Sequence, residues 1–136
     1  MIRPFYKFLA LILLGMVLTQ CSDKNSGEYV KEGLEHLNHE QYDSAKKFFL
    51  KAIEKDANNA DGYYSLGGIY NYQKKFKDAE QAFKLVLKID PTHHNAWYSL
   101  GYTYELMGKK DEAEESYKKD RRLKGEMDTI MGQKKR

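Results

Sequence analysis

The chain has 136 residues, which is enough for one domain, and it carries 23 Lys and Arg against 20 Asp and Glu. Arg3 and Lys7 are the only charged residues among the first twenty, so the rest of the chain is close to neutral. This balance argues against a nucleic-acid-binding protein, and the interspersed charges of both signs are typical of solvent-exposed helix faces.

The first twenty residues have the layout of a secretory signal peptide. Arg3 and Lys7 form a positive beginning, and an apolar run from Phe8 to Leu18 follows. This run is too short to cross a bilayer comfortably. We therefore expect residues 1–20 to be a signal peptide rather than a membrane helix.

The only cysteine of the chain, Cys21, directly follows this segment. With Leu18 three places before it, the site resembles the lipobox of bacterial lipoproteins, although Gln20 stands where that family prefers a small residue. The resemblance implies that Cys21 becomes a lipidated N-terminus. The protein would then be membrane-anchored in the bacterial cell envelope, more at the outer membrane than elsewhere, with residues 21–25 as a flexible tether. The alternative is a chance cysteine in an uncleaved anchor.

Beyond residue 25 the chain repeats itself with a step of 34 residues. Small residues recur at one set of positions and large aromatic residues at another, in a fixed order. The recurring residues are Gly33, Gly67 and Gly101; Ala45, Ala79 and Ala113; Tyr29, Tyr63 and Trp97; and Phe49, Phe83 and Tyr117.

The middle copy reads Tyr63-x-x-Leu66-Gly67-x-x-Tyr70, then Ala79-x-x-x-Phe83, then Pro91. The third copy repeats the pattern with Trp97 in the first place. This part of the chain resembles the tetratricopeptide-repeat (TPR) family over about residues 26–127. The resemblance implies an all-α fold, in which three tandem helix-turn-helix repeats, 26–59, 60–93 and 94–127, form a right-handed superhelix.

The spacing of these residues has a physical reason of its own. Positions 63, 66, 67 and 70 share one face of a first helix, and positions 79, 82, 83, 86 and 87 share one face of a second. Where the two faces cross, a glycine lets the backbones approach and an aromatic ring fills the space beside it. We expect replacement of Gly67 by leucine to cost on the order of 1–3 kcal/mol by overpacking.

The end repeats depart from the pattern in ways that suit chain ends. The first repeat, with helices predicted near 27–39 and 42–55, has Glu32 and His36 where the others have apolar residues. In the third repeat, Asp120 replaces an apolar residue, which we read as an outer face meeting water. Pro91 ends the second repeat, and Thr92 is a predicted cap for the helix that follows.

A C-terminal helical extension is predicted for residues 128–136. The apolar stripe of Leu123, Met127, Ile130 and Met131 continues at helical spacing, and we expect it to form a short capping helix that covers the open end of the stack, followed by a basic tail.

The first helix of each pair has apolar residues on a second face as well. In the TPR family the corresponding positions line a concave groove that holds a peptide or helix of a partner protein. Tyrosine offers a large contact area together with a hydrogen-bonding end, which suits protein recognition. We also expect Asn71 to bind the partner's backbone. The alternative is that several of these side chains pack against the next repeat. The predicted groove residues are Val30, Leu34, Leu37, Tyr64, Asn71, Tyr72, Tyr98, Tyr102 and Leu106.

The sequence carries no signal for an enzyme, a cofactor or a metal site. His36 with His39, and His93 with His94, lack further ligands at suitable spacing, and we interpret them as solvated or loop histidines. We therefore expect a lipid-anchored adaptor that binds another protein. The alternatives are a self-assembling structural protein, including a homodimer, and a non-catalytic accessory subunit of an envelope enzyme.

Overall fold

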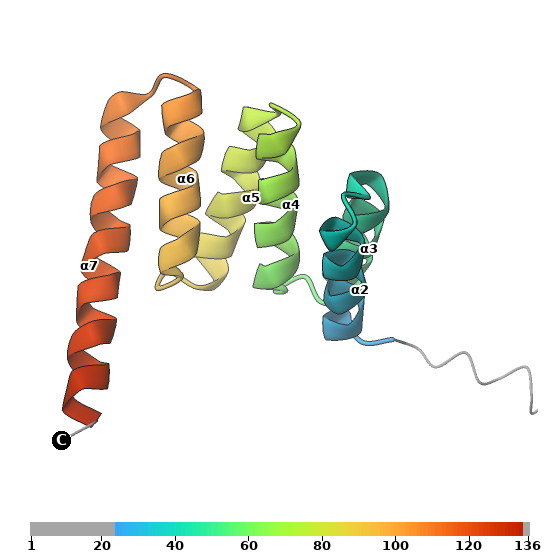
Figure 1. The fold of residues 1–136 in the computed structure, drawn as a ribbon, viewed down its shortest axis with the longest axis horizontal. Helices are drawn as coiled ribbons and strands as arrows, with labels where there is room; N and C mark the ends of the chain where they lie inside the picture. The colour runs from blue at the N-terminus through green and yellow to red at the C-terminus, as the bar shows by residue number, and fades with distance from the viewer. Residues whose placement is uncertain (1–23, 135–136) are drawn as a thin grey trace, which may run out of the picture.

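The computed structural model describes residues 24–134, which form six α-helices and no strand (Figure 1). The predicted signal peptide and Cys21 lie outside this range. In chain order the helices are α2 (Ser26–Asn38), α3 (Tyr42–Lys55), α4 (Ala60–Tyr72), α5 (Phe76–Ile89), α6 (His94–Leu106) and α7 (Lys110–Lys134). Within the described range, no helix combines the length and the apolar character needed to cross a membrane.

The helices form three consecutive antiparallel pairs, α2–α3, α4–α5 and α6–α7, and the first helices of the pairs begin 34 residues apart. The all-α repeat solenoid predicted from the sequence is confirmed. The backbones of the first helices α2, α4 and α6 approach their neighbours in the row, whereas the backbones of α3, α5 and of the described part of α7 stay farther apart. The row of first helices is therefore the inner, concave face, and the second helices lie on the outer face.

Each pair is held by the predicted contact between a glycine and an aromatic ring. A β-carbon added to Gly33 would lie 2.5 Å from the ring of Phe49, and one added to Gly67 would lie 2.6 Å from the ring of Phe83. Both rings are almost completely buried, and Ala45 and Ala79 beside them are fully buried. Among the described residues the core consists of two clusters, and Tyr70 packs against both of them.

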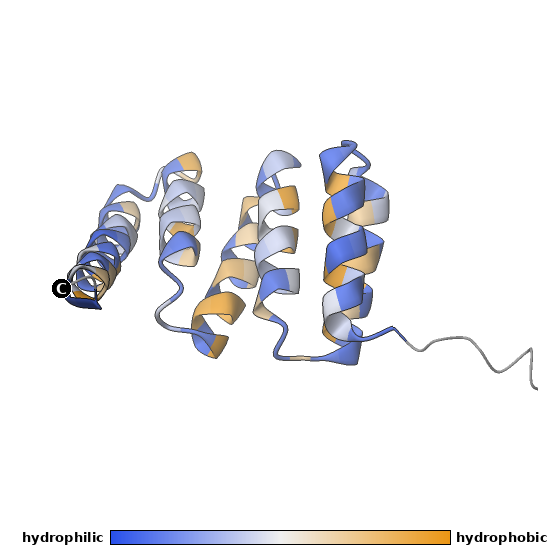
Figure 2. Ribbon diagram, turned by 60° about the horizontal axis from the view of Figure 1, so that its bottom comes forward, coloured by the Kyte–Doolittle hydropathy of each residue, from blue (hydrophilic) through white to orange (hydrophobic). Residues whose placement is uncertain are grey.

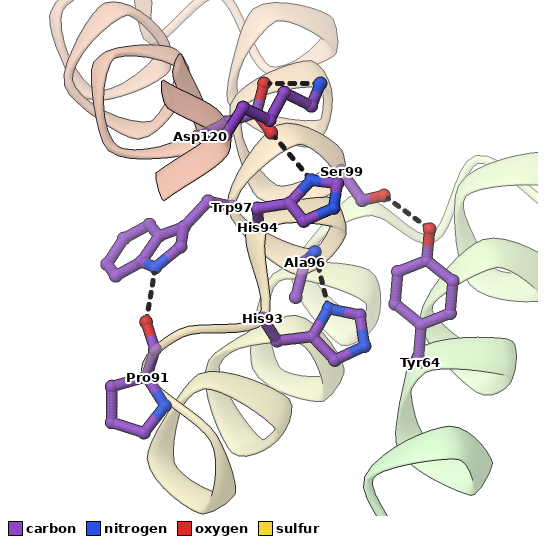
Figure 3. Close-up of polar contacts among 9 residues, drawn as sticks. Tyr64, Pro91, His93, His94, Ala96, Trp97, Ser99 and Asp120 are labelled. Carbon is purple, nitrogen blue, oxygen red and sulfur yellow. Dashed lines mark hydrogen bonds and ion pairs between the residues drawn. The ribbon is translucent and has the colours of Figure 1, made fainter. Parts of the chain in front are cut away.

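The helix ends repeat as regularly as the core. Asn25 and Asn59 accept hydrogen bonds at the N-termini of α2 and α4, from the backbone N–H of Glu28 and of Gly62. The equivalent position before α6 is His93, whose Nδ1 accepts from the backbone N–H of Ala96 at 3.0 Å (Figure 3).

The prediction that Thr92 caps α6 is therefore wrong. The Thr92 side chain and backbone N–H instead donate to Asp90 at 2.6 and 2.9 Å, and the two bonds lower the pKa of the Asp90 carboxyl. His93 is one place closer to the helix and has a ring long enough to reach the third backbone N–H.

The chain enters α2 in a more ordered way than the predicted tether implied. Asn25 and Glu28 form a reciprocal capping box, Lys24 pairs with Glu32, and the Ser26 hydroxyl donates to the carbonyl of Ala52 at 2.9 Å. Residues 24 and 25 thus belong to the fold rather than to a free spacer.

The predicted capping helix at the C-terminus does not form as a separate element. It is the second half of α7, a single helix of 25 residues that runs past the start of α6 (Figure 1). Leu123 is buried, but Met127, Ile130 and Met131 are 45%, 65% and 60% exposed and cover no other helix of the described chain. The reason is local: Gly125 stands where the second repeat has a proline, and a glycine weakens a helix without breaking it.

The interpretation of Asp120 as a water-facing residue is also wrong. Asp120 is only 4% exposed, and its carboxylate lies 3.1 Å from Nδ1 of His94 and 3.0 Å from Nζ of Lys124 (Figure 3). The contact with His94 connects the start of α6 to the middle of α7. Most of α7 is otherwise hydrophilic, as Figure 2 shows, so this polar contact supplements a limited apolar seam.

Candidate partner-binding groove

A hollow of about 350 Å³ opens on the concave face between the first and second pairs. Most of its wall is apolar or aromatic, and no charged side chain lines it. A pocket of this kind favours an apolar side chain and offers nothing to neutralise an anion. The lining residues are Leu34, Leu37, Tyr42, Tyr64, Ser65, Gly68, Ile69, Phe83 and Ser99.

Gly68 keeps this hollow open. A β-carbon added at this position would meet no atom within 4 Å, so no packing contact requires a glycine here. A glycine inside a helix costs roughly 1 kcal/mol relative to alanine. The equivalent positions in the other repeats hold Leu34 and Tyr102, so a side chain at position 68 would occupy the space that is now empty.

Tyr64 forms a fixed wall of the hollow. Its hydroxyl lies 3.3 Å from the hydroxyl of Ser99 on α6, and its ring packs edge-on against Phe83 and close to His93 (Figure 3). The hydroxyl is thus held by the fold, and the ring is held on two sides. Tyr64 is a preorganised part of the surface rather than a mobile side chain.

The rim of the hollow carries a pair of stacked tyrosines. The rings of Tyr42 and Tyr72 are 4.2 Å apart between centroids and almost parallel, and the hydrogen bond between the two side chains raises the pKa of Tyr42. Tyr72 remains 66% exposed. One face of this pair is therefore available to a ligand, with its position already fixed.

Val30 was predicted to line the groove, and the structure contradicts this. Val30 is 8% exposed and packs in the core cluster that contains Leu66 and Ile69. The same position holds tyrosines in the next two repeats. A valine is too short to extend beyond the contact between α2 and α4, whereas a tyrosine reaches past it.

Asn71 does not offer its amide to a partner, contrary to our expectation. Its Nδ2 donates to Oγ1 of the buried Thr103 at 2.9 Å, and that hydroxyl lies 2.7 Å from the carbonyl oxygen of Ser99. Asn71 therefore links α4 to α6 across the concave face. The spacing of residues placed it on the correct face but did not reveal this partner.

Three of the predicted residues, Tyr98, Tyr102 and Leu106, lie on α6 and are 52%, 46% and 41% exposed. They do not line the hollow. Tyr98 packs against Tyr117 and lies under the ammonium group of Lys124. The predicted groove thus consists of a formed hollow, which includes Leu34, Leu37 and Tyr64, and an open aromatic surface on α6.

Besides Gly68, which has no side chain, five residues of the hollow are absent from the predicted groove. Each of them lies on a helix face that the repeat pattern assigns to another contact, or, like Ser65 and Ser99, carries only a small polar side chain. Phe83 in particular was interpreted only as the partner of Gly67. The missed residues are Tyr42, Ser65, Ile69, Phe83 and Ser99.

Three of the four histidines are structural rather than solvated or loop residues, whereas His39 is an exposed turn residue after α2, as predicted. His93 caps α6, His94 contacts Asp120, and the ring of His36 stacks on Phe48. Within residues 24–134 no group of three or more potential ligands could hold a metal ion.

Family models described as "Tetratricopeptide repeat" match residues 29–59, 60–93 and 82–115. The first two correspond to the first and second helix pairs. The third match, to residues 82–115, begins in α5 and continues through α6. It is possible because the second helix of one repeat and the first helix of the next also form an antiparallel pair. No curated protein has a sequence that matches this chain.

The fold is similar to several solved structures. MamA is 26% identical with a TM-score of 0.74, over 77% of this chain and 61% of MamA, so this chain spans about three fifths of that protein. The second TPR of Spaghetti (RPAP3), bound to the HSP90 peptide SRMEEVD, is 19% identical with a TM-score of 0.71, over 74% of this chain and 93% of that one. The Sgt2 TPR domain from Aspergillus fumigatus is 22% identical with a TM-score of 0.69, over 74% of this chain and 66% of that one.

Proposed function

Since this chain belongs to the tetratricopeptide-repeat family, we propose that it is a non-catalytic adaptor that holds an apolar segment of a partner protein in its concave hollow. The observation that carries this proposal is the hollow itself, which is apolar, uncharged and kept open by a glycine with no packing role. Peptide binding by a structural neighbour, the TPR of Spaghetti, supports the general mode.

The chemistry of the hollow restricts what the partner can present. That neighbour holds a peptide with the acidic end EEVD. The hollow of this chain contains no Lys or Arg to receive such a carboxylate, and its polar groups are hydroxyls. The ligand is therefore a bulky aliphatic or aromatic side chain, flanked by backbone that passes over Gly68 and the exposed ring of Tyr72.

Site-specific photocross-linking in the native cell tests this mode. A cross-linker placed at Gly68 or Tyr72 is expected to capture a partner, whereas one placed at the exposed Lys47 on the outer helix α3 is not. The captured protein is then purified, and its affinity for the chain is measured directly.

Leu34→Lys, which places a charge in the hollow, is expected to weaken that affinity by about tenfold or more, because the lysine must keep its ammonium group hydrated. Leu85→Lys makes the same chemical change on the outer face and serves as the matched control. Equal binding by both variants would refute the groove.

The location of the protein is a separate part of the proposal. The positive beginning, the apolar run and Cys21 support a lipid anchor, with the folded domain held beside a membrane of the bacterial envelope. Replacement of Cys21 by serine is expected to abolish palmitate incorporation and release the protein from sedimented membranes. Unchanged palmitate labelling in this variant would contradict the anchor.

A non-catalytic accessory subunit of an envelope enzyme differs from this adaptor only in the identity of its partner. Identification of the cross-linked protein distinguishes the adaptor from the accessory subunit. The self-assembling alternative rests on a different surface.

A further inference from the structure

A second apolar cleft lies on the outer face, between α3 and α5, with α4 as its floor. It has a volume of about 230 Å³ and includes two leucines whose side chains are partly exposed, Leu50 at 46% and Leu85 at 39%. The lining residues are Leu50, Ile53, Tyr63, Leu66, Tyr70, Asp78, Gln81, Ala82 and Leu85.

The same cleft recurs one repeat further along, between α5 and α7, but with charged walls. There the two leucine positions are taken by Lys84 and Lys119. The volume is about 370 Å³, and the lining residues are Lys84, Leu87, Lys88, Trp97, Leu100, Tyr104, Glu112, Glu115 and Ser116. The fold therefore accepts lysines at these positions, and the exposed leucines of the first cleft are not needed for packing.

The two clefts also differ in charge around the tyrosine of their floor. In the second cleft, the Tyr104 hydroxyl donates to Glu80 at 3.2 Å, and Glu80 pairs with Lys84 at 2.6 Å and with Lys109 at 3.5 Å. The charges of Lys84 and Lys109 at this site are therefore paired with a carboxylate of the same chain.

In the first cleft, the positions equivalent to Glu80 and Lys109 hold Lys46 and Lys75. The ammonium group of Lys46 lies 5.0 Å from the centre of the Tyr70 ring. Neither lysine, nor Asp78 in the cleft wall, forms an ion pair within the described residues. The first cleft thus combines exposed leucines with the ammonium group of Lys46 at its edge, over Tyr70, and with the carboxylate of Asp78 in its wall. An apolar segment that carries an acid suits the edge beside Lys46.

The free half of α7 has this chemistry. Met127, Ile130 and Met131 lie on one face of the helix and are among the most exposed large apolar residues of the described chain, and Asp128 lies within the same turn without an ion pair in the described residues. In the described structure α7 contacts only α6. Because α7 is one continuous helix fixed along α6, this segment does not reach the cleft between α3 and α5 of its own chain.

We infer that the free half of α7 docks into the cleft between α3 and α5 of a second copy. Met127, Ile130 and Met131 contact Leu50 and Leu85, and Asp128 approaches Lys46. The contact joins two different surfaces, so each copy keeps one free cleft and one free helix end, and chains of copies grow with concentration. This contact is independent of the concave hollow and of the proposed adaptor function.

Sedimentation velocity over a concentration series of the fragment 22–136, which contains all six described helices and both core clusters, tests the inference. The wild-type fragment is expected to form dimers and larger species as its concentration rises. Ile130→Asp/Met131→Asp and Leu50→Lys/Leu85→Lys are each expected to weaken association by about tenfold or more. Both variants change exposed side chains, and circular dichroism checks that the helices remain.

Mixing the two double variants gives the sharpest result. One variant keeps an intact cleft and the other an intact helix end, so an equimolar mixture is expected to form a dimer that goes no further, although each variant alone is monomeric. Lys46→Glu is expected to weaken association, and Asp128→Lys in the same chain is expected to restore it.

Leu34→Lys is the matched control, because it changes an equally exposed leucine in the concave hollow and is expected to leave association unchanged. A wild-type fragment that stays monomeric at every concentration would overturn the inference. So would a mixture that stays monomeric, or loss of association in Leu34→Lys, which would place the contact in the hollow instead.

Discussion

Phe83 occupies the space that a side chain at position 67 would need. A β-carbon added to Gly67 would lie 2.6 Å from one ring carbon of Phe83 and 2.7 Å from another, which is closer than packed atoms approach. The ring is 2% exposed, packs in a core cluster and meets Tyr64 edge-on, so moving it aside disturbs these contacts.

We therefore predict that Gly67→Ala destabilises the fold by about 1–3 kcal/mol, even though alanine is the better helix former. Gly68→Ala is the matched control, because it lies next in the same helix with open space around it. It is expected to raise stability by about 0.5–1 kcal/mol. Urea unfolding of the fragment 22–136 measures both, and equal effects would contradict the contact.

The buried carboxylate of Asp120 supports the packing of α7 on α6. Asp120→Ala is expected to cost about 1–3 kcal/mol, because the ring of His94 loses its partner and a cavity remains. Asp120→Val, with the residue found at this position in the second repeat, is expected to cost less because it fills the space. The same unfolding measurement compares them. An Asp120→Ala variant as stable as the wild type would show that the carboxylate is dispensable.

Tyr117 is predicted to be the last or among the last tyrosines to ionise. Burial, followed by the hydrogen bond from its hydroxyl to Glu105 at 2.8 Å, raises the pKa of Tyr117 to about 12 from an ordinary value of 10.0. Because the pKa is raised in the folded state, the stability linked to this group is complete below pH 10 and is lost as the pH rises towards 12.

An ultraviolet titration of the wild type and of Tyr117→Phe checks this, with the late ionisation step reduced in the variant. The pKa of Tyr42 is raised as well, so Tyr42→Phe identifies the remaining late step. Glu105→Gln is expected to lower the pKa of Tyr117. Identical titration curves for wild type and Tyr117→Phe would contradict the assignment.

Asn71 is predicted to act on stability rather than on recognition. Its amide bridges α4 to Thr103 on α6, so Asn71→Ala is expected to destabilise the fold by about 0.5–1.5 kcal/mol. The affinity for the groove partner is expected to change by less than about twofold, far less than in Leu34→Lys. A large loss of affinity in Asn71→Ala at unchanged stability would contradict this prediction and would assign Asn71 to the binding surface.

The sequence was most informative where one residue's role follows from its own repeat. Gly33, Gly67 and Gly101, with the rings opposite them, recur at a fixed step, and the step predicts both the helix pairs and their crossing. Trp97 and Tyr63 fall at matching places for the same reason. The interpretation of residues 1–20 as a signal peptide and of Cys21 as a lipid anchor stays a prediction, because these residues lie outside the described range.

Predictions failed where a residue's environment comes from a neighbouring helix. Val30 and Tyr64 hold the same repeat position, yet Val30 is buried in the core and Tyr64 lines the hollow. The short valine side chain ends within the contact with the next helix, whereas the longer tyrosine side chain extends past it. Asp120 is polar but buried, because His94 and Lys124 satisfy its carboxylate. The period of a sequence gives the face on which a residue lies but not the side chain that meets it there.

The sequence by itself determined that this protein is a stack of three helix pairs, since helical spacing and a 34-residue step are properties of the chain alone. The tertiary structure decided which surfaces are open: a hollow above Gly68, a cleft between Leu50 and Leu85, and a helix end that covers nothing. The exposure of a side chain depends on which helices, often distant in the sequence, pack over it. The local pattern of residues does not contain this information.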